Sequence, residues 1–262
     1  MRRSAASLML VVLLAAMTLS CRHRVPVGES ASSARSNLPE VVVMGTIHSG
    51  HLRSEGYSIE VFQDVVRKVN PDYVLVEIPP GRLSVALNEH HHGKVEESRV
   101  KRFPEYVQGL FPLHDELDFE MVPCAAWTRE MADARRAKLE DWRSTRPEES
   151  AQVRAAQERA DEAQRAEGID DDPRGIHSPR YHELVRQGME PYDRLFNDDL
   201  GPGGWTNINE AHFALIDEAI REHAAPGKRF LITFGSWHAY WFIDQLKERD
   251  DVVLRDLREF LE

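Results

Sequence analysis

The sequence contains little cysteine, no apolar run long enough to cross a membrane and no excess of basic residues. Its 262 residues include only two cysteines, Cys21 and Cys124, so at most one disulfide can form and a disulfide-stapled scaffold is excluded. Hydrophobic residues make up 42% of the chain and charged residues 29%, which is typical of a globular domain. This composition excludes a multi-pass membrane protein, a collagen-like chain and a fully disordered chain.

Negative charge is concentrated in the part of the chain that follows residue 40. The whole chain has a net charge of −11, whereas residues 1–40 hold five arginines and two glutamates and carry +3. The remainder therefore carries −14. A domain this acidic repels phosphate backbones, so we expect no nucleic-acid partner.

The first twenty residues have the pattern of an export signal. A basic start precedes an apolar run over residues 5–19 that is too short for a transmembrane helix, and a small residue followed by Cys21 resembles a bacterial lipoprotein cleavage box. We expect a signal peptide over 1–20, lipidation of Cys21 and a flexible tether over 21–39. This places the protein in the bacterial cell envelope, on the periplasmic side of the outer membrane in a Gram-negative cell. The alternative is a plain secretory signal.

Residues 40–262 have the pattern of an α/β domain. Short β-branched runs without polar alternation are typical of parallel strands that helices cover on both faces. Segments of helical periodicity lie between these runs, so we predict a mostly parallel central sheet flanked by helices. Strands are expected at 41–44, 73–78, 119–124, 229–234 and 252–254, and helices over 56–69, over 209–223 and from 238 onward.

A charged segment over residues 129–174 interrupts this pattern. It contains ten Lys or Arg and thirteen Asp or Glu, together with many helix-forming alanines and few large apolar side chains. We expect an exposed helical insertion that ends at Asp170-Asp171-Asp172-Pro173. Two interpretations stay open: a solvated insertion, and a lid or partner-binding arm.

Two copies of one small motif stand at the ends of two expected strands. Gly45-Thr46-Ile47-His48 follows the first strand, and Gly235-Ser236-Trp237-His238 follows the fourth. In each copy we expect the glycine to let the chain turn sharply as it leaves the sheet. Glu77 ends the second strand, so all three segments reach the carboxyl edge of the sheet, where open α/β sheets bind ligands.

Two imidazoles and a carboxylate suit a divalent transition metal with open positions for water or substrate. Such a metal acidifies water and polarises a carbonyl group, which favours hydrolysis. We expect His48 and His238 to be metal ligands and Glu77 to be a third ligand or the general base. Thr46 and Ser236 are candidate positioning partners for the histidines or for a metal-bound water.

Arg82 and the other histidines leave alternatives open. Arg82 is interpreted either as a group that holds a substrate carboxylate or as one half of a structural ion pair. His51 is a further candidate for lining the mouth of the site. We interpret His90-His91-His92 as a solvated loop, because it follows no strand and its neighbours are charged.

Taken together, these motifs resemble the TraB/GumN/Tiki family. That family has a Gly-Thr-x-His motif, a Pro-Asp-x-Val-x-x-Glu strand with an arginine shortly after it, and a late Gly-x-x-His motif. The corresponding segments are Met44–His48, Pro71–Ile78 followed by Arg82, and Phe234–His238. The family often has Arg-Asn in a late helix, where this chain has Ile208-Asn209.

The resemblance implies an α/β fold related to erythromycin-esterase-like and ChaN-like proteins. Tiki members are manganese- or cobalt-dependent proteases, so it assigns His48, Glu77 and His238 to the metal and catalytic residues and Arg82 to the family arginine. TraB members act against peptide pheromones, and ChaN is a haem-binding lipoprotein. We therefore expect a membrane-anchored hydrolase of peptide or ester bonds that uses Mn, Co or Zn. The alternative is a lipoprotein that binds haem or another ligand without turnover.

Overall fold

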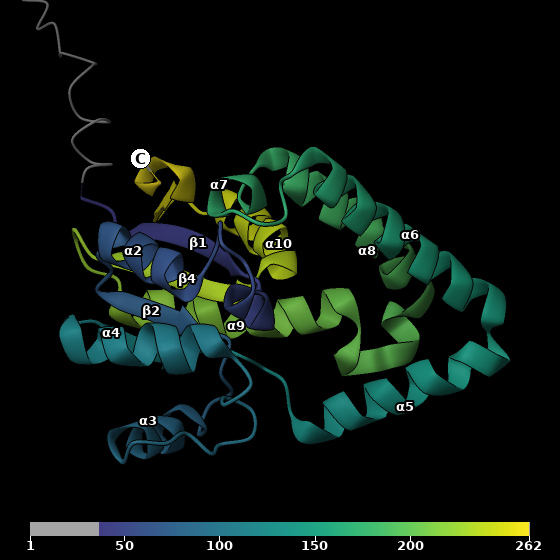
Figure 1. The fold of residues 1–262 in the computed structure, drawn as a ribbon, viewed down its shortest axis with the longest axis horizontal. Helices are drawn as coiled ribbons and strands as arrows, with labels where there is room; N and C mark the ends of the chain where they lie inside the picture. The colour runs from purple at the N-terminus through teal and green to yellow at the C-terminus, as the bar shows by residue number, and fades with distance from the viewer. Residues whose placement is uncertain (1–36, 262) are drawn as a thin grey trace, which may run out of the picture.

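The structure is a computed structural model that describes residues 37–261. The expected signal peptide, Cys21 and residues 21–36 of the expected tether lie outside the described residues. Within the described range, helices cover both faces of one sheet (Figure 1), which confirms the predicted α/β fold. In this same range, no helix is long and apolar enough to cross a membrane.

The described sheet has five parallel strands in the order β3-β2-β4-β1-β5. β4, which comes late in the chain, lies between β1 and β2 and pairs with both. Thr46 lies opposite Gly235, and Val76 lies opposite Thr233, so the carboxyl ends of β1, β4 and β2 are adjacent. The bounds are β1 Glu40–Thr46, β2 Tyr73–Val76, β3 Glu120–Pro123, β4 Arg229–Gly235 and β5 Val253–Arg255.

The helices that pack on and around this sheet come from every part of the described chain. The longer ones are α2 Ile59–Val69, α3 Leu83–His91, α5 Arg129–Thr145, α6 Pro147–Glu167, α8 Pro179–Leu200, α9 Trp205–His223 and α10 Ser236–Lys247. The shorter ones are η1 His48–Leu52, η2 Glu105–Leu110, α4 Phe111–Glu116, α7 Pro173–Ile176, η3 Gly201–Gly203 and η4 Leu257–Phe260.

Alternate residues along the strands pack into two separate hydrophobic cores, one on each face of the sheet, as expected for a sheet that helices cover on both sides. Val42 and Met44 of β1 pack in one core with residues of α2, η2, α4 and α8. Val41 and Val43 point to the other face and pack with residues of α9 and α10. Because both faces of the central strands β1, β2 and β4 are buried, these strands have no exposed polar side and appear in the sequence as nearly continuous apolar runs.

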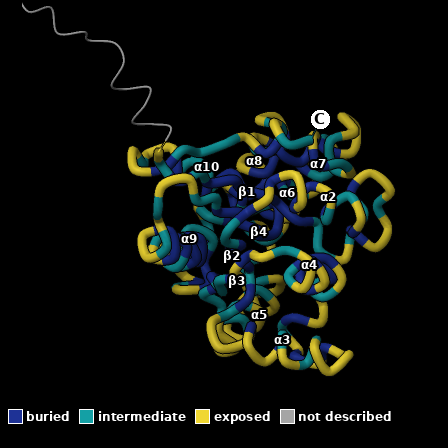
Figure 2. Tube along the Cα trace, turned by 90° about the vertical axis from the view of Figure 1, so that its left-hand side faces the viewer, coloured by how far each residue is buried: buried dark blue, intermediate teal, exposed yellow. Residues whose placement is uncertain are grey.

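The charged segment is helical as predicted, but its two helices differ in burial. None of the residues of α5 is buried, and Figure 2 shows it as largely exposed. α6 instead buries Val153, Ala156 and Ala160, and Gly188 of α8 lies directly against Ala160. The expectation of an exposed segment therefore holds for α5 and is wrong for α6, where small residues allow two helices to pack closely.

The two motif glycines are needed for close packing of the motifs. At Gly235, β4 passes directly into α10, which is the expected sharp turn, whereas β1 continues past Gly45 to Thr46, so the turn expected at Gly45 is wrong. Neither Gly45 nor Gly235 has a positive φ, and each is the penultimate or last residue of its strand. A Cβ atom on Gly45 would lie 2.8 Å from Ser236 Cα, and one on Gly235 would lie 2.7 Å from His48 Nε2. Glycine thus lets the two motifs touch each other.

Replacing Gly45 with alanine should destabilise the fold because the new methyl group collides with the backbone of Ser236. We expect the free energy of unfolding, measured by urea denaturation, to fall by about 1–3 kcal/mol, the usual cost of overpacking. Gln152→Ala, on the exposed face of α6, is the control and should change little. Equal stability of Gly45→Ala and the control would contradict the close packing of the motifs.

Candidate active site

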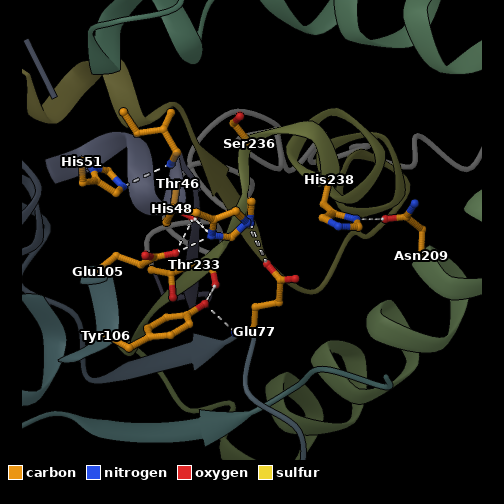
Figure 3. A network of polar contacts seen from close by, with 12 residues as sticks. Thr46, His48, His51, Glu77, Glu105, Tyr106, Asn209, Thr233, Ser236 and His238 are labelled. Atoms are coloured by element: carbon orange, nitrogen blue, oxygen red, sulfur yellow. Dashed lines mark hydrogen bonds and ion pairs between the residues drawn. The ribbon is translucent and has the colours of Figure 1, made fainter. Parts of the chain in front are cut away.

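The two motif histidines and Glu77 lie at the carboxyl ends of three adjacent strands (Figure 3). His48 follows β1, His238 is in the first turn of α10 directly after β4, and Glu77 follows β2. His48 Nε2 is 4.0 Å from Glu77 Oε2. The strand order therefore places Glu77 and His238 at neighbouring strand ends, although they are 161 positions apart in the sequence.

His48 is held in an unusual backbone conformation by a buried carboxylate. Its φ is 49°, which is uncommon for a residue with a side chain and which clusters at functional sites. His48 Nδ1 lies 2.6 Å from Glu105 Oε1 and donates its proton there, because an ionised carboxylate only accepts. The ring therefore presents its Nε2 lone pair toward Glu77 when it is neutral.

Glu105 is a buried residue of the candidate site that no sequence motif marks. It is fully buried at the start of η2, a π-helical segment, and such segments often occur at functional sites. Its Oε1 also accepts a hydrogen bond from Thr46 Oγ1 at 3.1 Å, while Oε2 is buried without a partner among the described residues. Glu105 does not follow a buried apolar strand, so the strand-end pattern that indicated His48 and Glu77 does not indicate it.

Glu105 also sets the charge state of His48. Burial lowers the pKa of His48, but the hydrogen bond to Glu105 and the negative charges of Glu105 and Glu77 outweigh this effect. The pKa of His48 is therefore raised above its ordinary value. A more basic imidazole is also a stronger metal ligand and a stronger proton acceptor.

Glu77 is fixed from two sides. Its Oε2 accepts a hydrogen bond from the Gly235 backbone N–H at 2.8 Å, and its own N–H donates to the hydroxyl of buried Tyr106 at 2.9 Å. Burial raises the pKa of Glu77, and the His48 charge and the Gly235 hydrogen bond only partly offset this rise. A carboxylate of raised pKa is suited to accept a proton near neutral pH.

His238 is oriented in the same way by Asn209. Asn209 Nδ2 donates to the Trp205 carbonyl at 2.8 Å, so its Oδ1 is the atom that accepts from His238 Nδ1 at 2.6 Å. The ring also stacks on Trp205 with centroids 4.8 Å apart. Burial and the nearby His212 lower the pKa of His238 well below its ordinary value, so this imidazole is neutral.

The motif hydroxyls have different roles. Thr46 bonds Glu105 and lies 3.4 Å from His48 Nδ1, which makes it a positioning residue as expected. Ser236 is buried and shares a 2.7 Å hydrogen bond with the Tyr181 hydroxyl. It therefore supports the start of α10 on the side of α8.

Two buried histidines act as backbone supports. His51 accepts from the Ile47 N–H at Nε2 and donates from Nδ1 to the Tyr57 carbonyl, so both of its nitrogens are used beneath the loop. His177, which the motifs did not mark, accepts from the Gly45 N–H at 2.7 Å. Its Nδ1 donates to a backbone carbonyl at 2.6 Å, which fixes the neutral tautomer.

Arg82 and the histidine tract lie in or beside α3. Arg82 is exposed and its nearest carboxylate is Glu97, with 3.8 Å between Nη1 and Oε1, which matches the ion-pair interpretation. The expectation of a loop for His90-His91-His92 is wrong at His90 and His91, which form the last turn of α3 and contact Asp115.

His48, His238 and Glu77 are suitable metal ligands by their chemistry, but their positions only partly match a metal site. Both motif histidines have Nδ1 bonded to an oxygen and Nε2 free, which is the usual arrangement of metal-bound histidine. The 4.0 Å between His48 and Glu77 is still within the reach of one ion, since zinc bonds are about 2.0–2.2 Å long. Across residues 37–261, however, no three His, Cys, Asp or Glu side chains converge closely enough to form a ready metal group.

Comparisons of the chain with models of known protein families, with curated proteins and with solved structures give no match.

Replacing Glu105 with glutamine should lower the pKa of His48, because the substitution removes the negative charge and keeps an acceptor of similar shape. The pKa of His48 in the metal-free protein can be followed by NMR titration. His182, whose pKa is lowered to about 4 by burial and without a contribution from Glu105, is the internal control and should keep its wild-type pKa. An unchanged His48 pKa would mean that Glu105 does not set its charge.

Buried His177 should make the fold acid-sensitive. Burial lowers its pKa from 6.5 to about 4, so between these values the unfolded chain binds a proton that the folded chain does not. The free energy of unfolding should therefore fall as the pH drops from about 6.5 to about 4, by up to about 3 kcal/mol from this residue. His177→Gln should flatten the profile measured by urea denaturation, and an equally steep profile would refute this account.

Proposed function

We propose that the protein is a hydrolase of peptide or ester bonds whose reaction takes place between His48, Glu77 and His238. One observation carries this proposal: both motif histidines have Nδ1 bonded to a buried side-chain oxygen and Nε2 free, and Glu77 faces His48 across 4.0 Å. Groups arranged in this way at the carboxyl edge of a parallel sheet suit activation of water.

The residues divide the chemistry between them. His48 and His238 would hold a divalent ion such as Mn, Co or Zn, which would supply Lewis-acid activation of water and of the scissile carbonyl when bound. Glu77 is the general base, because its raised pKa lets it take a proton from the attacking water and return it to the leaving group.

Four further residues are positioning residues. Glu105 and Asn209 fix the tautomers of His48 and His238, and Tyr106 and Gly235 fix Glu77. Removing such a partner from a metal ligand typically costs about 10- to 100-fold in metal affinity or activity.

The sequence pattern supports the same proposal. The two Gly-x-x-His motifs and the strand glutamate resemble those of the TraB/GumN/Tiki family, and the α/β fold is of the kind that this resemblance implies. We extend the proposal to location: a protein lipidated at Cys21, facing the periplasm from the outer membrane and acting on peptides or small molecules there.

The mature domain should hydrolyse members of a peptide and ester library in the presence of Mn, Co or Zn and lose this activity with a chelator. His48→Ala and His238→Ala should each reduce turnover and bound metal, measured by elemental analysis, because each removes a free Nε2. The matched control is His92→Ala, which removes an exposed histidine outside the site.

Three outcomes would contradict parts of this proposal. Unchanged metal content in the His48→Ala/His238→Ala double variant would exclude these residues as the metal site. Turnover that survives the chelator but depends on His48 would assign His48 and Glu105 to a metal-free general-base reaction. No turnover, combined with a haem absorption band that these substitutions abolish, would favour the binding-protein alternative.

A further inference from the structure

A cavity of about 650 Å³ opens beside Glu77 and is lined mainly by arginine. One wall is formed by residues 98–102, which precede η2, and the other by residues 129–136 in the first turns of α5. Five arginines and two acidic residues line it, so the walls have a net charge of +3. This reverses the sign of the domain as a whole, which is strongly negative.

Three of these arginines lack a carboxylate partner in the described part of the chain. Arg129 and Arg136 both pair with Asp133, which also lines the cavity. No carboxylate lies within 4.0 Å of the guanidinium groups of Arg99, Arg102 and Arg135, as judged from residues 37–261.

Neighbouring side chains hold two of the unpaired guanidinium groups in place. Arg135 Nε donates to the Tyr192 hydroxyl at 2.9 Å, and Arg102 lies 4.7 Å above the ring of Phe103. The same Phe103 ring packs against His48, with centroids 4.8 Å apart. Arg102 therefore connects the cavity to the catalytic histidine through one aromatic ring.

Five guanidinium groups around one cavity would stabilise an anion bound among them. Burial, and next the positive charge of Arg102, lower the pKa of Arg99. A bound anion would relieve the repulsion between these two groups. Glu77 lines the same cavity, so a ligand held by the arginines would lie beside the reaction centre.

We propose that this cavity binds carboxylate groups of an acidic peptide and holds them beside Glu77. A guanidinium group matches a carboxylate with two parallel hydrogen bonds, and the volume is that of an ordinary ligand site. The inference rests on the proposed function because it names the substrate class of the same site. It also gives α5 a role, since the exposed charged segment supplies one wall.

Calorimetric titration with two blocked hexapeptides, one of glutamate and one of glutamine, tests binding without turnover. The glutamate peptide should bind about tenfold or more tightly than the glutamine peptide, and added salt should weaken it. Arg99→Gln/Arg102→Gln should weaken it by about tenfold, because these groups lose their charge. The matched control is Arg154→Gln/Arg159→Gln on exposed positions of α6, which should bind as the wild type does.

Equal binding of the two peptides, or undiminished binding by Arg99→Gln/Arg102→Gln with a native circular dichroism spectrum, would overturn the proposal. Tighter binding of inorganic phosphate than of the glutamate peptide would also overturn it, because the cavity would then be a phosphate site. The single variant Arg102→Gln, at an exposed position, repeats the test with a smaller perturbation.

The failure of this inference and the failure of the proposed function are distinguishable. Tight binding of the glutamate peptide without hydrolysis of any substrate would contradict the proposed hydrolase activity and support the carboxylate-binding cavity. Hydrolysis of neutral peptides with no preference for acidic ones would support the proposed hydrolase activity and overturn the proposal that the cavity binds carboxylates.

Discussion

The hydrogen bond between His48 and Glu105 is the interaction on which the site depends. A carboxylate that is fully buried is costly unless it is paired, and here the imidazole and the Thr46 hydroxyl are its partners. The bond joins the loop after β1 to η2, and it holds His48 in a left-handed conformation with Nε2 toward Glu77. Removing the carboxylate would free both the ring and the loop.

The strand order supplies the second condition. Because β4 lies between β1 and β2, the first motif, the second motif and Glu77 occupy three neighbouring strand ends. The motif glycines let the motifs touch, since a side chain on either would collide with the other motif. The site is therefore a property of the sheet topology as much as of the residues themselves.

The strands and the placement of His48, Glu77 and His238 at three adjacent strand ends were predictable, because continuous apolar runs and parallel strand ends leave few alternatives. The packing role of the two glycines was not predictable, because a close approach between segments 190 residues apart leaves no local pattern in the sequence. The sequence also did not predict the roles of Glu105, His177 and the arginine-lined cavity, because each depends on which loop or helix lies across a strand end. Likewise, α6 could not be distinguished from α5 by composition, because its core contacts are made by alanines.

The most direct test of the account is turnover by Glu105→Gln compared with the wild type, on the best substrate from the library and at matched metal content. Because Glu105 touches no reacting atom and acts through His48, we expect kcat to fall by about 10- to 100-fold while the domain stays folded. A kcat equal to that of the wild type, in a variant whose His48 pKa has fallen, would contradict the claim that this buried pair organises the site.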